Sequence, residues 1–139
     1  MGLVVAEPPV YPLELQWVDL TAYRRGNTGI DYLHSFDSGV AGPHVMVNAL
    51  THGNELCGMV AVRRLLDAEV RPRVGRLTLS FANVAAYRQF APDRLHARCV
   101  DRDFNRLWHD DMLAADRTSI EGRRAHELLP VIRSVDRLL

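Results

Sequence analysis

One stretch constrains the fold most: a mainly apolar run that ends in a small polar turn and leads straight into a helical pattern. Residues 45–50 form the run, residues 51–53 read Thr-His-Gly, and the helical pattern begins at Asn54. A buried strand followed directly by a helix is typical of an α/β sheet. His52 and Glu55 then lie at the carboxyl end of a strand, where such folds place their functional sites.

The segments before this stretch predict an arm and two strands. Residues 1–12 contain three prolines, so we expect an extended arm. Alternation over residues 13–21 predicts a strand, a turn cluster fills residues 24–29, and residues 30–36 predict the second strand of an antiparallel pair. The third strand, over residues 44–50, is expected to be more buried.

The segments after it predict a parallel unit. Residues 54–70 have a helical apolar face, and the strand expected over residues 77–83 completes a strand–helix–strand unit, which favours parallel pairing. Residues 84–119 are expected to be mostly irregular with short helical pieces, and residues 120–134 predict a second helix. Residues 135–139 are expected to begin another buried strand. The expected fold class is therefore α/β, a mixed sheet with a parallel centre flanked by helices.

Composition excludes several classes of function. The 139 residues carry 17 Lys plus Arg and 17 Asp plus Glu, so no net field favours nucleic acid or an anionic membrane. No apolar run approaches the roughly 18 residues of a membrane span, and the N-terminus lacks a basic secretion signal, which predicts a cytoplasmic protein. The two cysteines predict no disulfide framework, and Cys57, within the helical pattern, is expected to be buried.

His52 and Glu55 are three residues apart at the predicted helix start. An imidazole and a carboxylate so placed can point the same way, and both suit Zn²⁺. The simpler alternative is a solvated histidine beside a carboxylate that a helix N-terminus favours.

A second group of polar residues lies in the irregular region, where residues 98–106 contain three arginines, two aspartates and an asparagine. Asn105 and Arg106 could bind a carboxylate together, because a guanidinium binds one bidentately and the amide adds a neutral donor. Arg98 could polarise a carbonyl group, and Asp103 could orient a metal-bound imidazole. A solvated charged loop is the alternative.

Together these motifs resemble the succinylglutamate desuccinylase/aspartoacylase family, which belongs to the zinc carboxypeptidase-like superfamily. The resemblance rests on residues 52–55 (His-Gly-Asn-Glu), on Arg98 and on residues 103–106 (Asp-Phe-Asn-Arg). Residues 83–87 also resemble the family, although Val84 stands where a proline is common. The resemblance runs from about residue 43 to the end of the chain.

The resemblance implies a role for each residue. His52 and Glu55 would be two zinc ligands, Arg98 would steady the carbonyl oxygen of the scissile amide, and Asp103 would hold His52 in its metal-binding tautomer. Asn105 with Arg106 would bind the substrate's carboxylate. The implied activity is zinc-dependent hydrolysis of an N-acyl amino acid or a similar small amide.

The family's third zinc ligand is a histidine in a segment whose run-up resembles residues 135–139, and its general base lies further on. We therefore expect residues 1–139 to be the N-terminal part of a single catalytic domain that does not turn over substrate alone. An exposed sheet edge and self-association through it are also expected. None of the remaining histidines is expected to be the third ligand; they are His34, His44, His96, His109 and His126. His126 is on the polar side of the last predicted helix and is expected to face solvent.

Three alternatives to the deacylase stay open. The first is a catalytically incomplete chain that binds only a carboxylate ligand or a partner protein, and the second is a carboxypeptidase-like peptidase. A nucleic-acid-binding module is the third, and the zero net charge argues against it.

Overall fold

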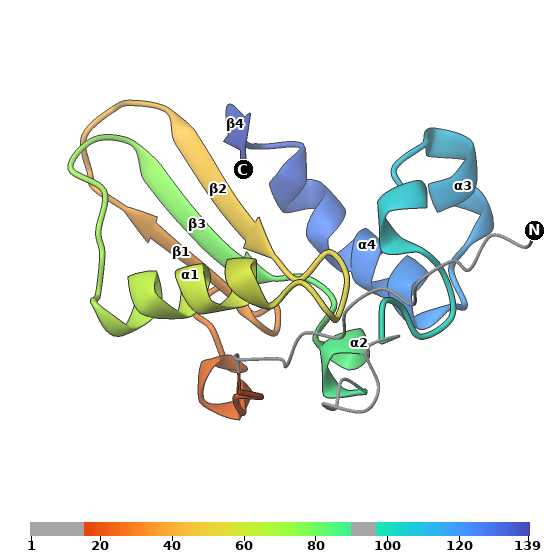
Figure 1. The fold of residues 1–139 in the computed structure, drawn as a ribbon. Coiled ribbons are helices and arrows are strands. Elements are labelled where there is room, and N and C mark those ends of the chain that lie inside the picture. Colours follow the sequence, from red (N-terminus) through yellow and green to blue (C-terminus); the bar gives the residue numbers. More distant parts are fainter. Residues whose placement is uncertain (1–15, 90–96) are drawn as a thin grey trace, which may run out of the picture.

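The computed structural model describes residues 16–89 and 97–139, which form a four-stranded sheet with helices on both faces (Figure 1). The predicted N-terminal arm, residues 13–15 of the first predicted strand and His96 lie outside the described residues. The strands and longer helices, in chain order, are β1 (Leu33–Asp37), β2 (His44–Ala49), α1 (Leu56–Asp67), β3 (Arg76–Phe81), α2 (Val84–Arg88), α3 (Asp110–Ala115), α4 (Ile120–Ile132) and β4 (Arg137–Leu138). Two 3₁₀ turns, η1 (Thr21–Tyr23) and η2 (Phe104–Arg106), complete the set.

The sheet has the strand order β1-β3-β2-β4. β2 pairs in parallel with β3 and with β4, whereas β1 pairs with β3 in the antiparallel direction. The α/β class, the mixed sheet and its parallel centre are therefore confirmed. Because Ala49 is opposite Phe81, β2 and β3 end together at one edge of the sheet, and the segments that follow them meet there.

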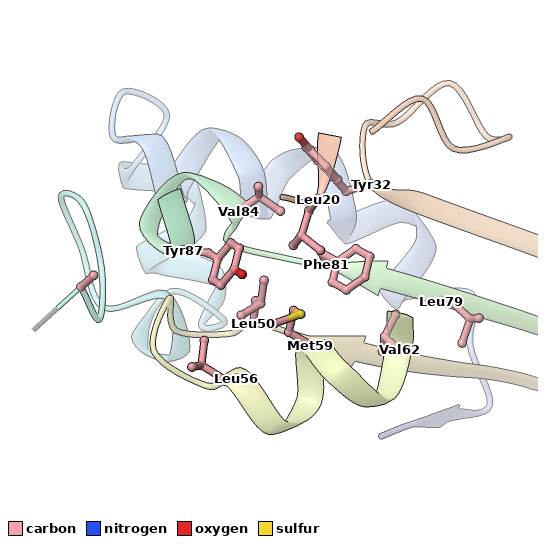
Figure 2. Close-up of a cluster of buried hydrophobic side chains, with 12 residues drawn as sticks. Leu20, Tyr32, Leu50, Leu56, Met59, Val62, Leu79, Phe81, Val84 and Tyr87 are labelled. Atoms are coloured by element: carbon pink, nitrogen blue, oxygen red, sulfur yellow. The ribbon is translucent and has the colours of Figure 1, made fainter. Parts of the chain in front are cut away.

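Two apolar clusters hold the layers together. On one face, α1 places Leu56, Met59 and Val62 against the sheet residues Leu79 and Phe81 (Figure 2). On the other face, α4 packs Ala125 and Leu128 in a cluster with Leu33, Met46 and Ala82. The helical period of the apolar positions in α1 and in α4 thus determines which side of each helix packs against the sheet.

Several sequence predictions for single elements are wrong. Residues 16–20 form no strand, because the Asp19 carboxylate accepts hydrogen bonds from the N–H and hydroxyl of Thr21 and so forms a turn. The antiparallel partner of β1 is consequently β3. The expected C-terminal strand forms as β4, but both of its residues are exposed rather than buried.

Two side chains also differ from expectation. Cys57 is an exposed free thiol, because it lies on the side of α1 away from Leu56 and Met59. His126, expected in solvent, is half-buried with its Nε2 2.8 Å from the carbonyl oxygen of Leu113. Within residues 16–89 and 97–139, no helix combines the length and the apolar character that crossing a bilayer requires.

Candidate functional site

The site begins where the chain leaves β2. Leu50 is 1% exposed and has φ of 60°, a left-handed conformation that non-glycine residues rarely adopt. Burial of the Leu50 side chain stabilises this strained conformation. The conformation turns the chain sharply before Thr51 and His52. Strained backbone of this kind is common where a functional side chain must be aimed.

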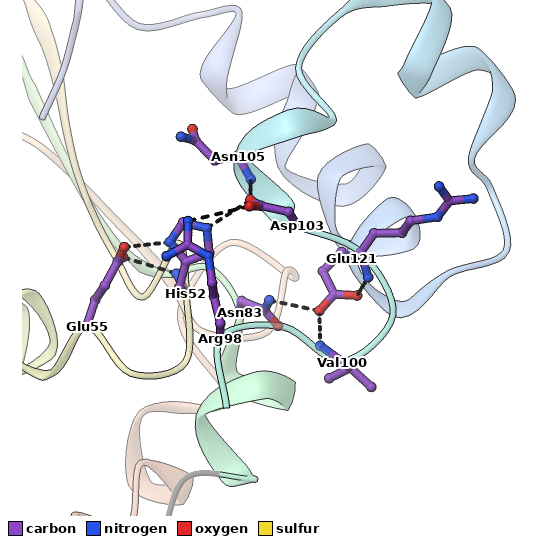
Figure 3. A network of polar contacts seen from close by, with 9 residues as sticks. His52, Glu55, Asn83, Arg98, Val100, Asp103, Asn105 and Glu121 are labelled. Atoms are coloured by element: carbon purple, nitrogen blue, oxygen red, sulfur yellow. Dashed lines mark hydrogen bonds and ion pairs between the residues drawn. The ribbon is translucent and has the colours of Figure 1, made fainter. Parts of the chain in front are cut away.

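His52 is 3% exposed and has a carboxylate at each ring nitrogen (Figure 3). Its Nδ1 lies 2.6 Å from Glu55 Oε1, and its Nε2 lies 2.9 Å from Asp103 Oδ1. The backbone N–H of His52 also donates to Glu55 Oε2 at 3.0 Å. The Glu55 side chain therefore makes no capping hydrogen bond to α1 but turns back onto the imidazole. Its contacts with the ring and with the His52 N–H fix the orientation of the imidazole.

Gly53 brings the two predicted motifs together. Its N–H donates to the carbonyl oxygen of Arg98 at 3.1 Å. A Cβ atom at this position would lie 2.3 Å from the carbonyl oxygen of Ala97 and 2.4 Å from the carbonyl carbon of Ala86. Only glycine lets the His52 turn approach the segment that carries Arg98 so closely.

Asp103 joins the histidine to the arginine. Its Oδ2 lies 3.4 Å from Arg98 Nη2, and its Oδ1 accepts the backbone N–H of Asn105 at 3.0 Å, which caps η2. The hydrogen bond from His52 holds the pKa of Asp103 below its usual range; partial burial opposes this, and the Asn105 N–H and the Arg98 charge add to it. Asp103 is thus set to remain an acceptor for the imidazole.

Asn105 and Arg106 differ in their placement. Asn105 lines a cavity of about 370 Å³ with Asn48 and Thr51 from the end of β2 and with apolar residues that include Phe104 and Trp108. Arg106 is exposed, and no hydrogen bond or ion pair joins its side chain to another residue in the described part of the chain. The structure therefore gathers His52, Glu55, Arg98, Asp103 and Asn105, and leaves Arg106 at the surface.

Sequence reasoning missed Glu121 and Asn83. Glu121 is 0% exposed although it carries a carboxylate, and Asn83, 2% exposed, donates to it from Nδ2 at 3.0 Å. Burial acts to raise the pKa of Glu121, but the hydrogen bonds from Val100, Asn83, Asp101 and Arg102 outweigh it and leave the pKa below its ordinary value. A signal was present, because Glu121 precedes the buried Ala125 and Leu128 by four and seven residues and so shares their face.

The donor set around His52 fits part of what a zinc ion requires. Nδ1 of His52 and Oε1 of Glu55 face each other, Glu55 is 45% exposed toward solvent, and Asp103 occupies the other ring nitrogen. This is the arrangement expected of a metal-binding histidine oriented by a carboxylate. The pair fits as two of three protein ligands, and residues 16–89 and 97–139 contain no group of three candidate ligands.

The comparisons with known proteins identify one family. Residues 41–136 match the model of the succinylglutamate desuccinylase/aspartoacylase catalytic domain. No curated protein and no solved structure matches the chain. Because the match covers more than half of the chain and includes all of the residues described above, this protein belongs to the succinylglutamate desuccinylase/aspartoacylase family, a family of hydrolases.

Proposed function

We propose that the family unit represented by this chain is a zinc-dependent hydrolase that removes the acyl group from an N-acyl amino acid or a similar small amide. One observation supports this most directly: His52 is buried between Glu55 and Asp103, with one ring nitrogen toward each carboxylate. A metal-binding histidine typically donates one ring N–H to a carboxylate, which fixes its tautomer, and turns the other nitrogen toward the metal and its next ligand.

In this proposal His52 and Glu55 hold the metal. Asp103 keeps the proton on Nε2, so that Nδ1 carries the lone pair that a metal requires. When bound there, zinc supplies Lewis-acid polarisation of the carbonyl group and a more acidic water molecule. Within residues 16–89 and 97–139, no third candidate ligand completes a group with His52 and Glu55.

Arg98 is proposed to steady the oxygen of the scissile carbonyl group. Its side chain is 51% exposed, and its contact with Asp103 is long, at 3.4 Å. Most N–H donors of the guanidinium therefore remain available to a substrate. Asp103, which also contacts His52, keeps the guanidinium near the imidazole. A fixed cation beside a developing negative charge is an effective catalytic group.

Asn105 and Arg106 are proposed to bind the substrate's carboxylate. Asn105 already lines the cavity beside the site, and Arg106, exposed on the same 3₁₀ turn, has its five donors available.

We also propose a cytoplasmic location, where the free thiols Cys57 and Cys99 would stay reduced.

A second candidate function is a catalytically incomplete protein that binds a carboxylate ligand or a protein partner. The observation that favours it is that only two candidate metal ligands converge within the described residues. A carboxypeptidase-like peptidase is a further candidate, since it would use the same kinds of groups on a peptide substrate.

A substrate panel separates these candidates. Because residues 1–139 are not expected to turn over substrate alone, the zinc-loaded chain is supplied with the C-terminal part of a catalytic domain of the family. The mixture is incubated with N-acyl amino acids and with short peptides, and release of the acyl acid or of the C-terminal amino acid is measured. Release of the acyl acid supports the deacylase, and release of only the C-terminal residue supports the peptidase. Saturable binding of N-acyl amino acids without any release supports the binding protein.

Arg106 is tested with the same panel. We expect Arg106→Ala to weaken binding of an N-acyl amino acid about tenfold or more, as loss of a charge-assisted pair implies. Arg73→Ala, an exposed arginine outside the site, is the control. Unchanged binding in Arg106→Ala, or equal losses in both variants, would remove Arg106 from the carboxylate site.

A further inference from the structure

Glu121 lies on the apolar face of α4, yet its carboxylate is surrounded by hydrogen-bond donors. Its Oε1 accepts the N–H of Val100 at 2.6 Å and the Nδ2 of Asn83 at 3.0 Å. Its Oε2 accepts the N–H groups of Asp101 and Arg102 at 3.0 and 3.1 Å. Figure 3 shows the carboxylate between the end of β3 and the segment that leads to Asp103.

Three successive backbone N–H groups directed at one anion form a concave binding site for negative charge. Here the anion is part of the protein, so the carboxylate is paired with four donors although it is fully buried. Loss of the carboxylate would leave several of these N–H groups without their acceptor. The backbone of residues 100–102 is therefore held in one conformation by α4.

That backbone lies between two residues of the site. Arg98 precedes the bound segment and Asp103 follows it directly, and Asp103 in turn holds Nε2 of His52. Asn83, the remaining donor, follows β3 and caps α2 through its Oδ1. The Glu121 carboxylate thus connects a helix, a strand end and the loop at one point.

We propose that Glu121 is a positioning residue for the metal site, because its carboxylate fixes residues 100–102 and through them the contact of Asp103 with the His52 imidazole. The consequence for metal binding rests on the function proposed above, whereas the effect on His52 does not. No contact of Glu121 with a substrate or a metal is involved.

The first test uses the metal-free chain and follows the ring nitrogens of His52 by nitrogen-15 NMR. Glu121→Gln is expected to shift the Nε2 resonance of His52, because Asp103 is no longer held against it. Glu127→Gln is the matched control, since Glu127 lies on the same helix with a side chain that is 56% exposed. An unchanged Nε2 resonance in folded Glu121→Gln would overturn the proposal.

The second test uses Zn²⁺ alone and compares Glu121→Gln, Asp103→Asn and the double variant by calorimetry. Loss of a carboxylate that orients a metal-binding histidine weakens metal affinity about tenfold to a hundredfold. If Glu121 acts through Asp103, the double variant is no weaker than Asp103→Asn alone. Losses that multiply would overturn the proposal. A wild-type chain that binds no zinc would contradict the proposed function and leave the NMR result to decide the role of Glu121.

A milder change and a wild-type measurement cover the case in which Glu121→Gln does not fold. Asn83→Ser keeps a residue that can cap α2 but removes one donor to Glu121, so a smaller shift of His52 Nε2 is expected. In the wild type, the amide hydrogens of Val100, Asp101 and Arg102 should exchange slowly. Exchange at the rate of an unstructured loop, or an unshifted His52 in Asn83→Ser, would overturn the proposal.

Discussion

His52 receives its two carboxylates in different ways. Glu55 is three residues away and reaches Nδ1 within one turn of chain, whereas Asp103 is 51 residues away and reaches Nε2 through the fold. The local partner is exposed to solvent and the distant partner is more enclosed, with exposed fractions of 45% and 31%. The ring nitrogen beside the more exposed carboxylate is therefore Nδ1, the atom proposed to bind the metal.

Glu121 makes stability depend on pH. Its pKa in the folded protein lies below the ordinary value of 4.5, so the unfolded chain binds the proton more tightly. Its contribution is present in full above pH 4.5 and is lost as the pH falls through the folded-state pKa. We therefore expect the free energy of unfolding of the wild type to exceed that of Glu121→Gln most at neutral pH, and the difference to narrow on acidification.

Chemical denaturation between pH 7 and about pH 3 measures this difference. Other carboxylates with lowered pKa values, such as Asp37 and Asp116, affect both proteins equally and cancel in the comparison. A difference that stays constant over this range would show that the Glu121 carboxylate is not stabilised in its charged form.

At the residue scale, the sequence revealed chemistry more readily than environment. The paired His52 and Glu55 could be predicted because three residues at a helix start are necessarily close. The placement of Asp103 came from a resemblance, since no local pattern brings it to His52. Glu121 was missed and Cys57 was misjudged, because the burial of a side chain in a helix depends on which face the rest of the fold covers.

At the scale of elements, the β2–α1 turn and the segment after residue 97 form one unit through Gly53. We expect Gly53→Ala to destabilise the protein by about 1–3 kcal/mol, because its Cβ would overlap the carbonyl oxygen of Ala97, 2.3 Å away. Thermal or chemical unfolding measures the change.

Gly58→Ala is the matched control for this prediction. Gly58 lies in α1, where a Cβ would meet the Cβ of Ala49 at 3.5 Å, an ordinary contact. Alanine is the better helix former, so this variant should gain up to about 1 kcal/mol. Equal destabilisation by both substitutions would argue against a special role for the close approach at Gly53.

The elements themselves could be predicted where local periodicity dominates. The parallel β2–α1–β3 unit and α4 follow from hydrophobic period and from the preferred direction of such connections. The partner of β1 could not be predicted, because pairing depends on contacts that are distant in sequence. The N-terminal segment alternates like a strand, yet the Asp19 side chain closes a turn there.

At the scale of the whole molecule, β4 leaves one side of the sheet open. β4 is an edge strand of the described sheet, and the adjacent residue Leu139 is 73% exposed. Exposed edges with apolar residues favour pairing between chains. We expect the protein to self-associate and Leu139→Lys to reduce this, as measured by sedimentation.

Val40→Lys is the comparison for this prediction. Val40 is also apolar and 54% exposed, but it lies in the β1–β2 connection rather than at β4. Unchanged association in Leu139→Lys, or an equal decrease in both variants, would exclude β4 as the contact.

The most direct test of the site is zinc binding by the purified chain, with stoichiometry from native mass spectrometry and affinity from calorimetry. The variants are His52→Ala and, as a control, His34→Gln on β1, where His34 Nε2 lies 3.0 Å from the Tyr23 carbonyl oxygen. If His52 and Glu55 are ligands, the wild type and His34→Gln bind one zinc ion, and His52→Ala binds it at least about tenfold more weakly. Equal affinity in wild type and His52→Ala, or no binding by the wild type, would contradict the assignment of this metal site.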